Sequence, residues 1–319
     1  MNNIVKFIND FWISNESGDK KVTGMLQKLS SDSLADVYIG FSEVGNRCLF
    51  LKADVSGVVS AQNEKTNISL IIDRVNSLVY IELNDIYFGE VFNDLIVSIF
   101  SHIKDMQSYQ SVQQFVVLFT KWNELFKSRI SKKLLSEREL YGLLGELFHL
   151  KKFLNNCNDA NDINYTLDSW SGPDGKANDF IFADINHEVK TIEATKDFVD
   201  ISSEYQLNCI EKPVLLVVYK SMRSNEGFSL SQIIDEIRII IDRNYGDVER
   251  LLHKLNMFNI DFKNKNVYED IKIEISKSFF YNTDHEDFPK ITPGNLIQGI
   301  NYVKYRINLS SIKNFTTQI

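Results

Sequence analysis

Three charged residues lie close together in the middle of the chain: Asp179, Glu188 and Lys190. In an extended strand alternate side chains share a face, so Glu188 and Lys190 project together while Val189 points the other way. A two-residue turn at 184–185 would place Asp179 opposite Lys190 on an antiparallel neighbour. The spacing therefore predicts that two carboxylates and one amine meet on one patch. A register slip of one residue would separate them.

This combination suits the hydrolysis of a phosphodiester, whose negative charge repels hydroxide. Asp179 and Glu188 offer the hard oxygen ligands that Mg²⁺ prefers. A bound divalent ion lowers the pKa of a water molecule and offsets charge that grows on the phosphoryl oxygens. Lys190 could orient or deprotonate the attacking water, or stabilise the transition state as a fixed cation. The same residue types also occur on solvated strand surfaces, which is the alternative interpretation.

A third carboxylate, Glu146, lies in a segment with helical spacing of leucines over 139–154. The apolar stripe predicts an amphipathic helix with a buried face. A glycine inside a helix costs about 1 kcal/mol relative to alanine, so Gly142 and Gly145 indicate close packing beside Glu146. Glu146 could reach the metal site directly or through water. Alternatively, it lies on the exposed polar side of the helix.

The order of these motifs resembles the PD-(D/E)XK proteins catalogued as DUF4420. The resemblance covers residues 136–220, whereas the N-terminal third agrees only in its general pattern. The segments that carry it are Gly142–Leu147, Trp170–Gly175, Asn178–Phe180, His187–Thr191 and Ile201–Leu207.

The resemblance implies a restriction-endonuclease-like fold and a Mg²⁺-dependent nuclease, with Mn²⁺ as a substitute ion. It also implies an association with bacterial anti-phage gene clusters. By position, the implied metal ligands are Asp179, Glu188 and Glu146. Lys190 completes the catalytic set, and Gln206 is a supporting polar residue.

Three further residues near these motifs have simple interpretations. Asp174 stands in a Pro-Asp-Gly turn, so it is a loop residue and Asp179 is the expected ligand. Gln206 could hydrogen-bond a base, a phosphate or Lys190, or could be a capping or surface amide. His187 should face away from Glu188 on the strand.

The downstream pattern predicts a mixed α/β core with a central sheet flanked by helices. The apolar run 213–219 indicates a central strand buried on both faces, and 201–210 is expected to be the helix that crosses between strands. The segment 230–241 has the period of an amphipathic helix that packs on the sheet. Residues 271–276 and 302–309 alternate like half-exposed strands that extend the sheet or form a hairpin beside it.

The N-terminal third predicts a separate module over 1–130, followed by the nuclease-like domain over 131–319. Short strands with polar turns indicate a small antiparallel sheet at 36–41, 47–52, 67–73 and 77–84. Two amphipathic helices are expected at 88–106 and 111–130. The module could recognise a nucleic acid or a partner subunit, or could only support the nuclease.

Composition favours a soluble cytoplasmic protein with no membrane association. The 319 residues are 44% hydrophobic, but no apolar stretch approaches the roughly 20 residues of a membrane helix, and a signal-peptide pattern is absent. The three cysteines lack paired metal spacing and are expected to be reduced thiols. Without a glycine-rich phosphate loop, any nucleotide-driven step must come from a partner. The resemblance to defence-associated proteins implies partners encoded in a defence operon, such as an ATPase or a methyltransferase.

Charge argues against strong DNA binding, because the net charge is −8 and phosphates require lysines and arginines. Basic residues of the second domain could line a groove; they are Lys132, Lys133, Lys151, Lys152, Lys263, Lys265, Lys272, Lys277, Lys304 and Arg306. The acidic balance predicts weak intrinsic affinity for duplex DNA. Recruitment would then come from a basic partner or from an assembly step, such as formation of a homodimer.

Together these features predict a Mg²⁺-dependent DNA endonuclease of a bacterial defence or restriction system. The alternative is a catalytically silent nuclease-fold module that binds DNA or a partner protein in a larger complex. A third interpretation is a nuclease that acts on RNA.

Overall fold

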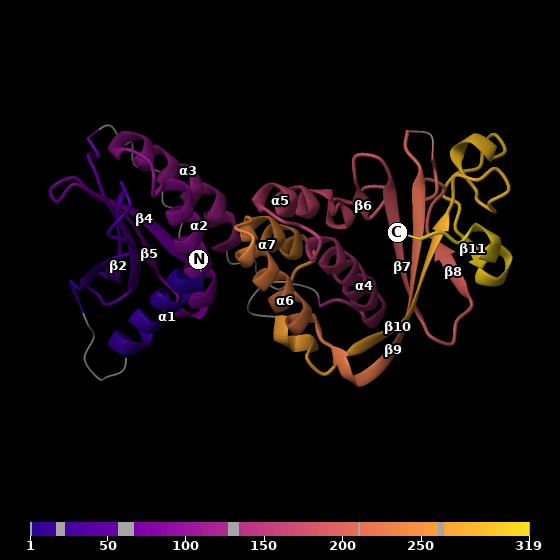
Figure 1. Cartoon of the computed structure of the whole chain (residues 1–319), viewed down its shortest axis with the longest axis horizontal. Coiled ribbons are helices and arrows are strands. Elements are labelled where there is room, and N and C mark those ends of the chain that lie inside the picture. Colours follow the sequence, from indigo (N-terminus) through magenta and orange to yellow (C-terminus); the bar gives the residue numbers. More distant parts are fainter. Residues whose placement is uncertain are drawn as a thin grey trace. The chain divides into compact units, whose positions relative to one another are not determined.

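The computed structural model describes residues 2–16, 23–56, 67–126, 134–209, 211–260 and 265–318. The chain divides into two compact units, Met1–Lys132 and Lys133–Ile319. Each unit contains its own sheet and helices (Figure 1).

The first unit contains a five-stranded antiparallel sheet in the order β1-β2-β3-β5-β4. The strands are β1 (Leu26–Lys28), β2 (Asp36–Phe41), β3 (Arg47–Lys52), β4 (Ile68–Asp73) and β5 (Leu78–Leu83). Alternate residues such as Val37, Leu49 and Val79 are fully buried, as the polar and apolar alternation requires. The four expected strands are confirmed, and β1 is an additional short strand.

Three helices belong to this unit: α1 (Asn2–Glu16), α2 (Gly89–Ile103) and α3 (Ser108–Phe126). The sequence patterns predict α2 and α3 but not α1, and the expected helical residues 127–130 lie outside the described part. Contrary to the sequence expectation, the segment Ile86–Ile103 is long and apolar enough to cross a membrane. Half of this segment is buried inside the unit, and a core helix of a soluble protein has the same length and composition.

The second unit contains a mixed four-stranded sheet in the order β10-β9-β7-β6. Its strands are β6 (Phe180–Ile181), β7 (Asn186–Glu193), β9 (Val214–Phe228) and β10 (Ile273–Asn282). β7 and β9 are parallel, whereas the other pairs are antiparallel. This arrangement confirms the mixed α/β class. It also confirms a central strand after residue 213 and a further strand near 271–276.

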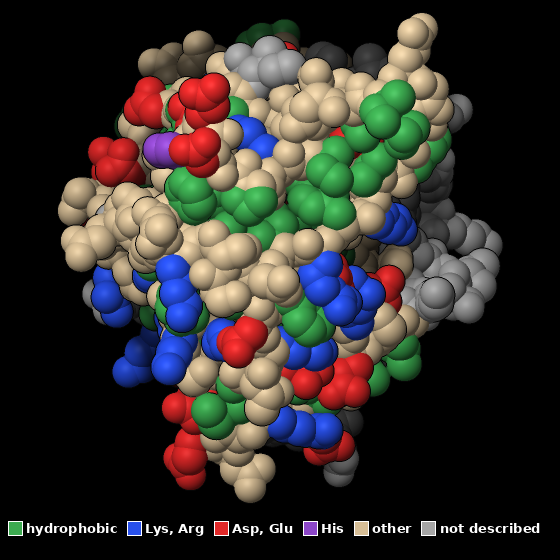
Figure 2. Space-filling view, turned by 90° about the vertical axis from the view of Figure 1, so that its right-hand side faces the viewer, with side chains coloured by type: hydrophobic (Ala, Val, Ile, Leu, Met, Phe, Trp, Pro, Cys, Tyr) green, Lys and Arg blue, Asp and Glu red, His purple; other side chains and the backbone are tan. Residues whose placement is uncertain are grey.

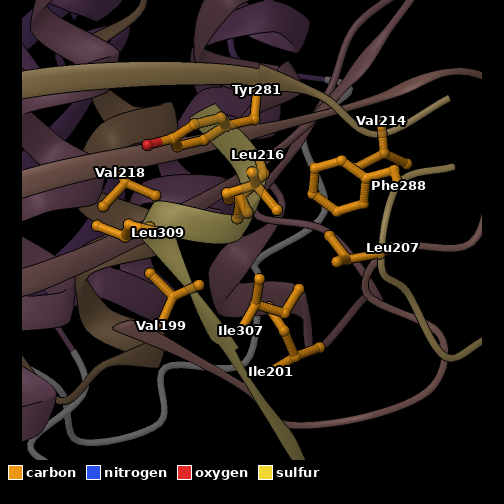
Figure 3. Packing of buried hydrophobic residues seen from close by; sticks show 11 residues of the cluster. Val199, Ile201, Leu207, Val214, Leu216, Val218, Tyr281, Phe288, Ile307 and Leu309 are labelled. Atoms are coloured by element: carbon orange, nitrogen blue, oxygen red, sulfur yellow. The ribbon is translucent and has the colours of Figure 1, made fainter. Parts of the chain in front are cut away.

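A two-stranded sheet of β8 (Phe198–Ile201) and β11 (Tyr305–Asn308) lies beside an apolar cluster. Figure 3 shows Leu216 and Val218 of the main sheet among side chains from these strands and from the C-terminal segment. The expected helix at 201–210 is therefore wrong, because β8 ends at Ile201 and turns follow; residue 210 is not described. Glu204 fixes these turns by accepting hydrogen bonds from the distant backbone of Tyr302 and Val303.

The helices of this unit are α4 (Glu137–Leu154), α5 (Ala160–Ser169), α6 (Leu230–Arg243) and α7 (Val248–Met257). A capping box between Ser136 and Glu139 starts α4, and the predicted leucine stripe of α4 is buried. α4 packs against β7 and α6. The helix expected at 230–241 is confirmed as α6, but its main packing partner is α4 and not the sheet.

Candidate active site

The antiparallel pair β6 and β7 places Asp179 next to the β7 strand. Phe180 pairs with His187 and Ile181 with Asn186, so residues 182–185 form the turn. Continuing this register by one residue places Asp179 opposite Glu188. The expected turn at 184–185 and the pairing of Asp179 with Lys190 are therefore wrong. Asp179 itself precedes β6 as a bend residue, so it reaches β7 through its side chain and not through strand pairing.

Glu188 and Lys190 project from β7 on the face that carries the apolar cluster, since they pair with Leu216 and Val218 of β9. The Glu188 side chain is fully buried, and its Oε1 lies 2.6 Å from Lys190 Nζ. This contact is a buried ion pair between the carboxylate and the ammonium. On the same strand, the Val189 N–H donates to Asp179 Oδ2 over 2.8 Å.

Glu146 approaches this group from α4. Its Oε2 accepts a hydrogen bond of 2.8 Å from Nε1 of the buried Trp170. A Cβ at Gly172 would lie 2.3 Å from the same oxygen, so any larger residue would displace the Glu146 carboxylate from this position. The Ser171 and Gly172 N–H groups donate to the Asp179 carbonyl over 2.8 and 3.0 Å. The turn that includes the 3₁₀ helix η2 (Gly172–Asp174) therefore contacts both Glu146 and Asp179. The alternative that Glu146 is an exposed surface residue is wrong.

The two glycines of α4 have different surroundings. A Cβ at Gly145 would lie 1.7 Å from Thr191 Oγ1, so this glycine permits close contact between α4 and β7. Among the residues that the structure describes, none has an atom within 4 Å of a Cβ at Gly142. The expectation of close packing is confirmed for Gly145 and wrong for Gly142.

Gln206 and Asn178 complete the surroundings of Glu188 and Lys190. Gln206 Oε1 lies 3.4 Å from Lys190 Nζ and accepts a 2.7 Å hydrogen bond from the Ser202 N–H, so it contacts the lysine. The buried Asn178 donates to the Gln206 carbonyl over 2.7 Å and to Glu188 Oε2 over 3.4 Å. The sequence reasoning assigned no role to Asn178 or to Trp170. The only signal was that a buried amide and a buried indole each need hydrogen-bond partners.

The electrostatics of this group are dominated by burial and mutual repulsion. Burial and the charge of Asp179 raise the pKa of Glu188 to about 8, against the opposing effects of Lys190 and Asn178. Burial followed by the charge of Asp179 also raises the pKa of Glu146 well above its usual value. Burial raises the pKa of Asp179 itself, although Lys190 opposes this.

Lys190 responds in the opposite sense. Burial acts to lower its pKa, but the charges of Glu188 and Asp179 outweigh burial and raise it. Lys190 therefore stays protonated next to the carboxylates. Three ionised carboxylates and one ammonium leave a formal charge of −2 in a poorly solvated place, which requires protons or an additional cation.

A family model described as "Putative PD-(D/E)XK family member, (DUF4420)" matches residues 13–310. The chain belongs to the DUF4420 family. Neither the curated proteins nor the solved structures contain a match to this chain. Membership suggests that this DUF4420 protein is a nuclease and that DNA is its substrate. Nucleases of the PD-(D/E)XK type generally depend on a divalent metal.

The donor set of this DUF4420 protein fits a divalent cation by its chemistry, since all three candidate ligands are carboxylates, the hard oxygen donors that Mg²⁺ prefers. Within the described ranges, however, no group of three or more His, Cys, Asp or Glu side chains is arranged to hold a metal ion. The carboxylates instead contact Trp170, the Val189 N–H and Lys190. To bind an ion, each carboxylate would have to give up one of these contacts.

The opposite face of β7 in this DUF4420 protein carries a buried histidine pair. His187 Nδ1 lies 2.9 Å from His149 Nε2, and His149 Nδ1 lies 2.7 Å from the Tyr219 hydroxyl. His187 thus faces α4 and points away from Glu188, as expected.

Several basic residues expected to line a groove are already paired with acids. The ion pairs are Lys151 with Glu236, Lys265 with Asp235 and Arg306 with Asp200, at 2.6, 3.0 and 2.8 Å. Lys132, Lys133 and Lys263 lie outside the described residues. These pairs reduce the positive charge that is free to meet phosphates.

Proposed function

We propose that this DUF4420 protein is a Mg²⁺-dependent DNA endonuclease, for which Mn²⁺ can substitute, and that Glu146, Asp179 and Glu188 are its metal ligands. The observation that carries this proposal is the set of three carboxylates around one ammonium, with raised pKa values at all three carboxylates. Withdrawing such charge from water is costly unless a cation compensates it. A silent binding module has no use for this arrangement, so we favour catalysis over that alternative.

The bound ion would lower the pKa of a water molecule and offset charge on the phosphoryl group. Lys190 supplies a fixed positive charge where negative charge grows in the transition state. Its contacts with Glu188 Oε1 and Gln206 Oε1 hold the ammonium in place. The raised pKa of Lys190 favours this role over that of a general base, which must first lose its proton.

The mixed sheet, with α4 packed on β7, supports the assignment of residues 131–319 as a restriction-endonuclease-like core. Residues 1–130 would form a recognition or supporting module. The net charge of −8 and the paired lysines support weak intrinsic affinity for duplex DNA. We therefore infer recruitment through a partner, such as an ATPase or methyltransferase of a cytoplasmic bacterial defence system, or through homodimerisation.

A calorimetric titration with Mn²⁺ tests the ligand assignment. Asp179→Asn and Glu188→Gln should lose metal binding while circular dichroism stays unchanged, because neutral amides are poorer ligands. Glu146→Gln should weaken binding so that only high metal concentrations restore it. Asp184→Asn is the matched control, because Asp184 is an exposed carboxylate on the turn between β6 and β7. Binding by Glu188→Gln equal to that of the parent would remove Glu188 from the site.

A further inference from the structure

Two segments next to the candidate active site expose large apolar side chains to solvent. Tyr205 is 54% exposed, and Tyr302 is 90% exposed. Ile297 and Ile300, in the segment that leads to Tyr302, are 75% and 49% exposed. Isolated exposed apolar residues are common, whereas contiguous apolar patches mark interaction sites, so these adjoining segments are a candidate for one.

A buried carboxylate joins these two segments. Glu204 is only 3% exposed, and its oxygens accept hydrogen bonds from the N–H groups of Tyr302 and Val303 at 3.3 and 3.0 Å. Tyr302 also has a φ of 60°, in the left-handed region that a large aromatic residue rarely adopts. The buried Glu204 carboxylate thus holds the backbone at Tyr302, although the Tyr302 side chain lies in solvent and packs little against the core.

The same segments lead directly to the candidate catalytic residues. Tyr205 stands between Glu204 and Gln206, and Gln206 contacts Lys190. Tyr302 precedes β11, whose Tyr305 pairs with Ile201 at the end of β8. Figure 2 looks onto the end of the unit that carries β8 and β11, where hydrophobic side chains form a band with Lys and Arg side chains beside it.

We propose that Tyr205 and Tyr302 form a stacking platform for unpaired nucleobases next to Lys190. This inference rests on the proposed nuclease function and specifies its substrate as DNA with an unpaired or single-stranded segment. Aromatic rings stack on any base, whereas the bases of a closed duplex are not accessible to them. Stacking also suits an acidic protein, because it does not depend on neutralising many phosphates.

A binding assay without cleavage tests the platform. The inactive Glu188→Gln chain is titrated at low salt against a fluorescent duplex with a five-nucleotide single-stranded gap and against the same duplex fully paired. The Glu188→Gln chain with both tyrosines intact should bind the gapped DNA more tightly than the fully paired duplex. Tyr302→Leu should lower the affinity for gapped DNA by about fivefold or more, Tyr205→Leu should act in the same direction, and Tyr302→Phe should keep the affinity.

Tyr245→Leu is the matched control, since Tyr245 is 62% exposed and has the same φ of 60° on the turn after α6. Equal affinities of Tyr302→Leu and Tyr245→Leu, or no preference for gapped DNA, would overturn the platform and leave a protein partner as the occupant of this surface. The nuclease proposal fails separately, if the parent chain cleaves no DNA under any metal condition while gapped binding still depends on Tyr302.

Discussion

At the scale of single residues, the main feature is an ammonium enclosed by carboxylates. The Lys190 side chain is 18% exposed and Glu188 is fully buried, so their 2.6 Å contact is poorly screened by water. The neighbouring charges keep Lys190 protonated, and Gln206 limits the directions in which its Nζ can move. Lys190 therefore has a fixed position as well as a fixed charge.

Replacing Lys190 by arginine separates position from charge. Lys190→Arg keeps the charge, but the planar guanidinium is larger and cannot take the place of Nζ between Glu188 and Gln206. We expect cleavage to fall about a hundredfold or more while Mn²⁺ binding persists. Cleavage rate and metal affinity should be measured on the same preparation. Cleavage within a few-fold of the parent would show that Lys190 is only an outer phosphate contact.

The strand periodicity is enough to predict that Glu188 and Lys190 share a face of β7. It cannot predict the residues that hold them. Trp170 contacts Glu146 across 24 residues, and Asn178 contacts the Gln206 backbone across 28. Such contacts depend on how α4 and the turn at 170–175 pack, which local patterns do not specify.

At the scale of elements, the close approach of α4 to β7 brings Glu146 to the strand residues. Gly145 permits this approach at Thr191, while Gly142 has open space. Gly145→Ala should destabilise the fold by about 1–3 kcal/mol because the new methyl group overlaps Thr191 Oγ1. Gly142→Ala should stabilise it by up to about 1 kcal/mol through helix propensity alone. Thermal unfolding of the two variants measures both effects.

The double variant Gly145→Ala with Thr191→Ala supplies the control. Removing Oγ1 should recover part of the loss, so the two changes should be non-additive. Equal melting temperatures of the Gly142→Ala and Gly145→Ala proteins would contradict the close packing of α4 on β7.

Elements with a clear hydrophobic period could be predicted from the sequence, as β9, α4 and α6 demonstrate. The segment 201–210 could not, because its conformation depends on Glu204 binding a backbone about a hundred residues away. The register of β6 with β7 also differs from the expected one, since the four residues 182–185 form the turn in place of two. Turn length is weakly encoded when no Asn-Gly or Asp-Gly pair is present.

At the scale of the whole molecule, the raised carboxyl pKa values couple folding to pH and to metal. Glu188 has a pKa of about 8 in the folded chain and an ordinary value of 4.5. Between these values the folded state holds a proton that the unfolded state has released. The free energy of unfolding should therefore fall as pH rises from about 5 to 8 in the presence of a chelator.

Mg²⁺ should reverse this trend, because it binds the ionised carboxylates. At a hundredfold excess over its Kd it should stabilise the fold by about 2.7 kcal/mol, and this gain should increase with pH over the same window. Melting curves at several pH values, with chelator and with Mg²⁺, measure both effects. Glu188→Gln should flatten the pH dependence. A parent protein whose stability rises with pH in chelator would contradict the burial of these carboxyl groups.

The most direct test of the central claim is cleavage of DNA by the purified full-length chain. Plasmid DNA and the gapped duplex are incubated with Mg²⁺, with Mn²⁺ and with chelator, beside the folded variants Glu188→Gln and Lys190→Ala. We predict products only when a divalent ion and both residues are present. Cleavage that persists in chelator or in Lys190→Ala, or a metal-loaded parent that cleaves neither DNA, would contradict the assignment of this site as a nuclease centre.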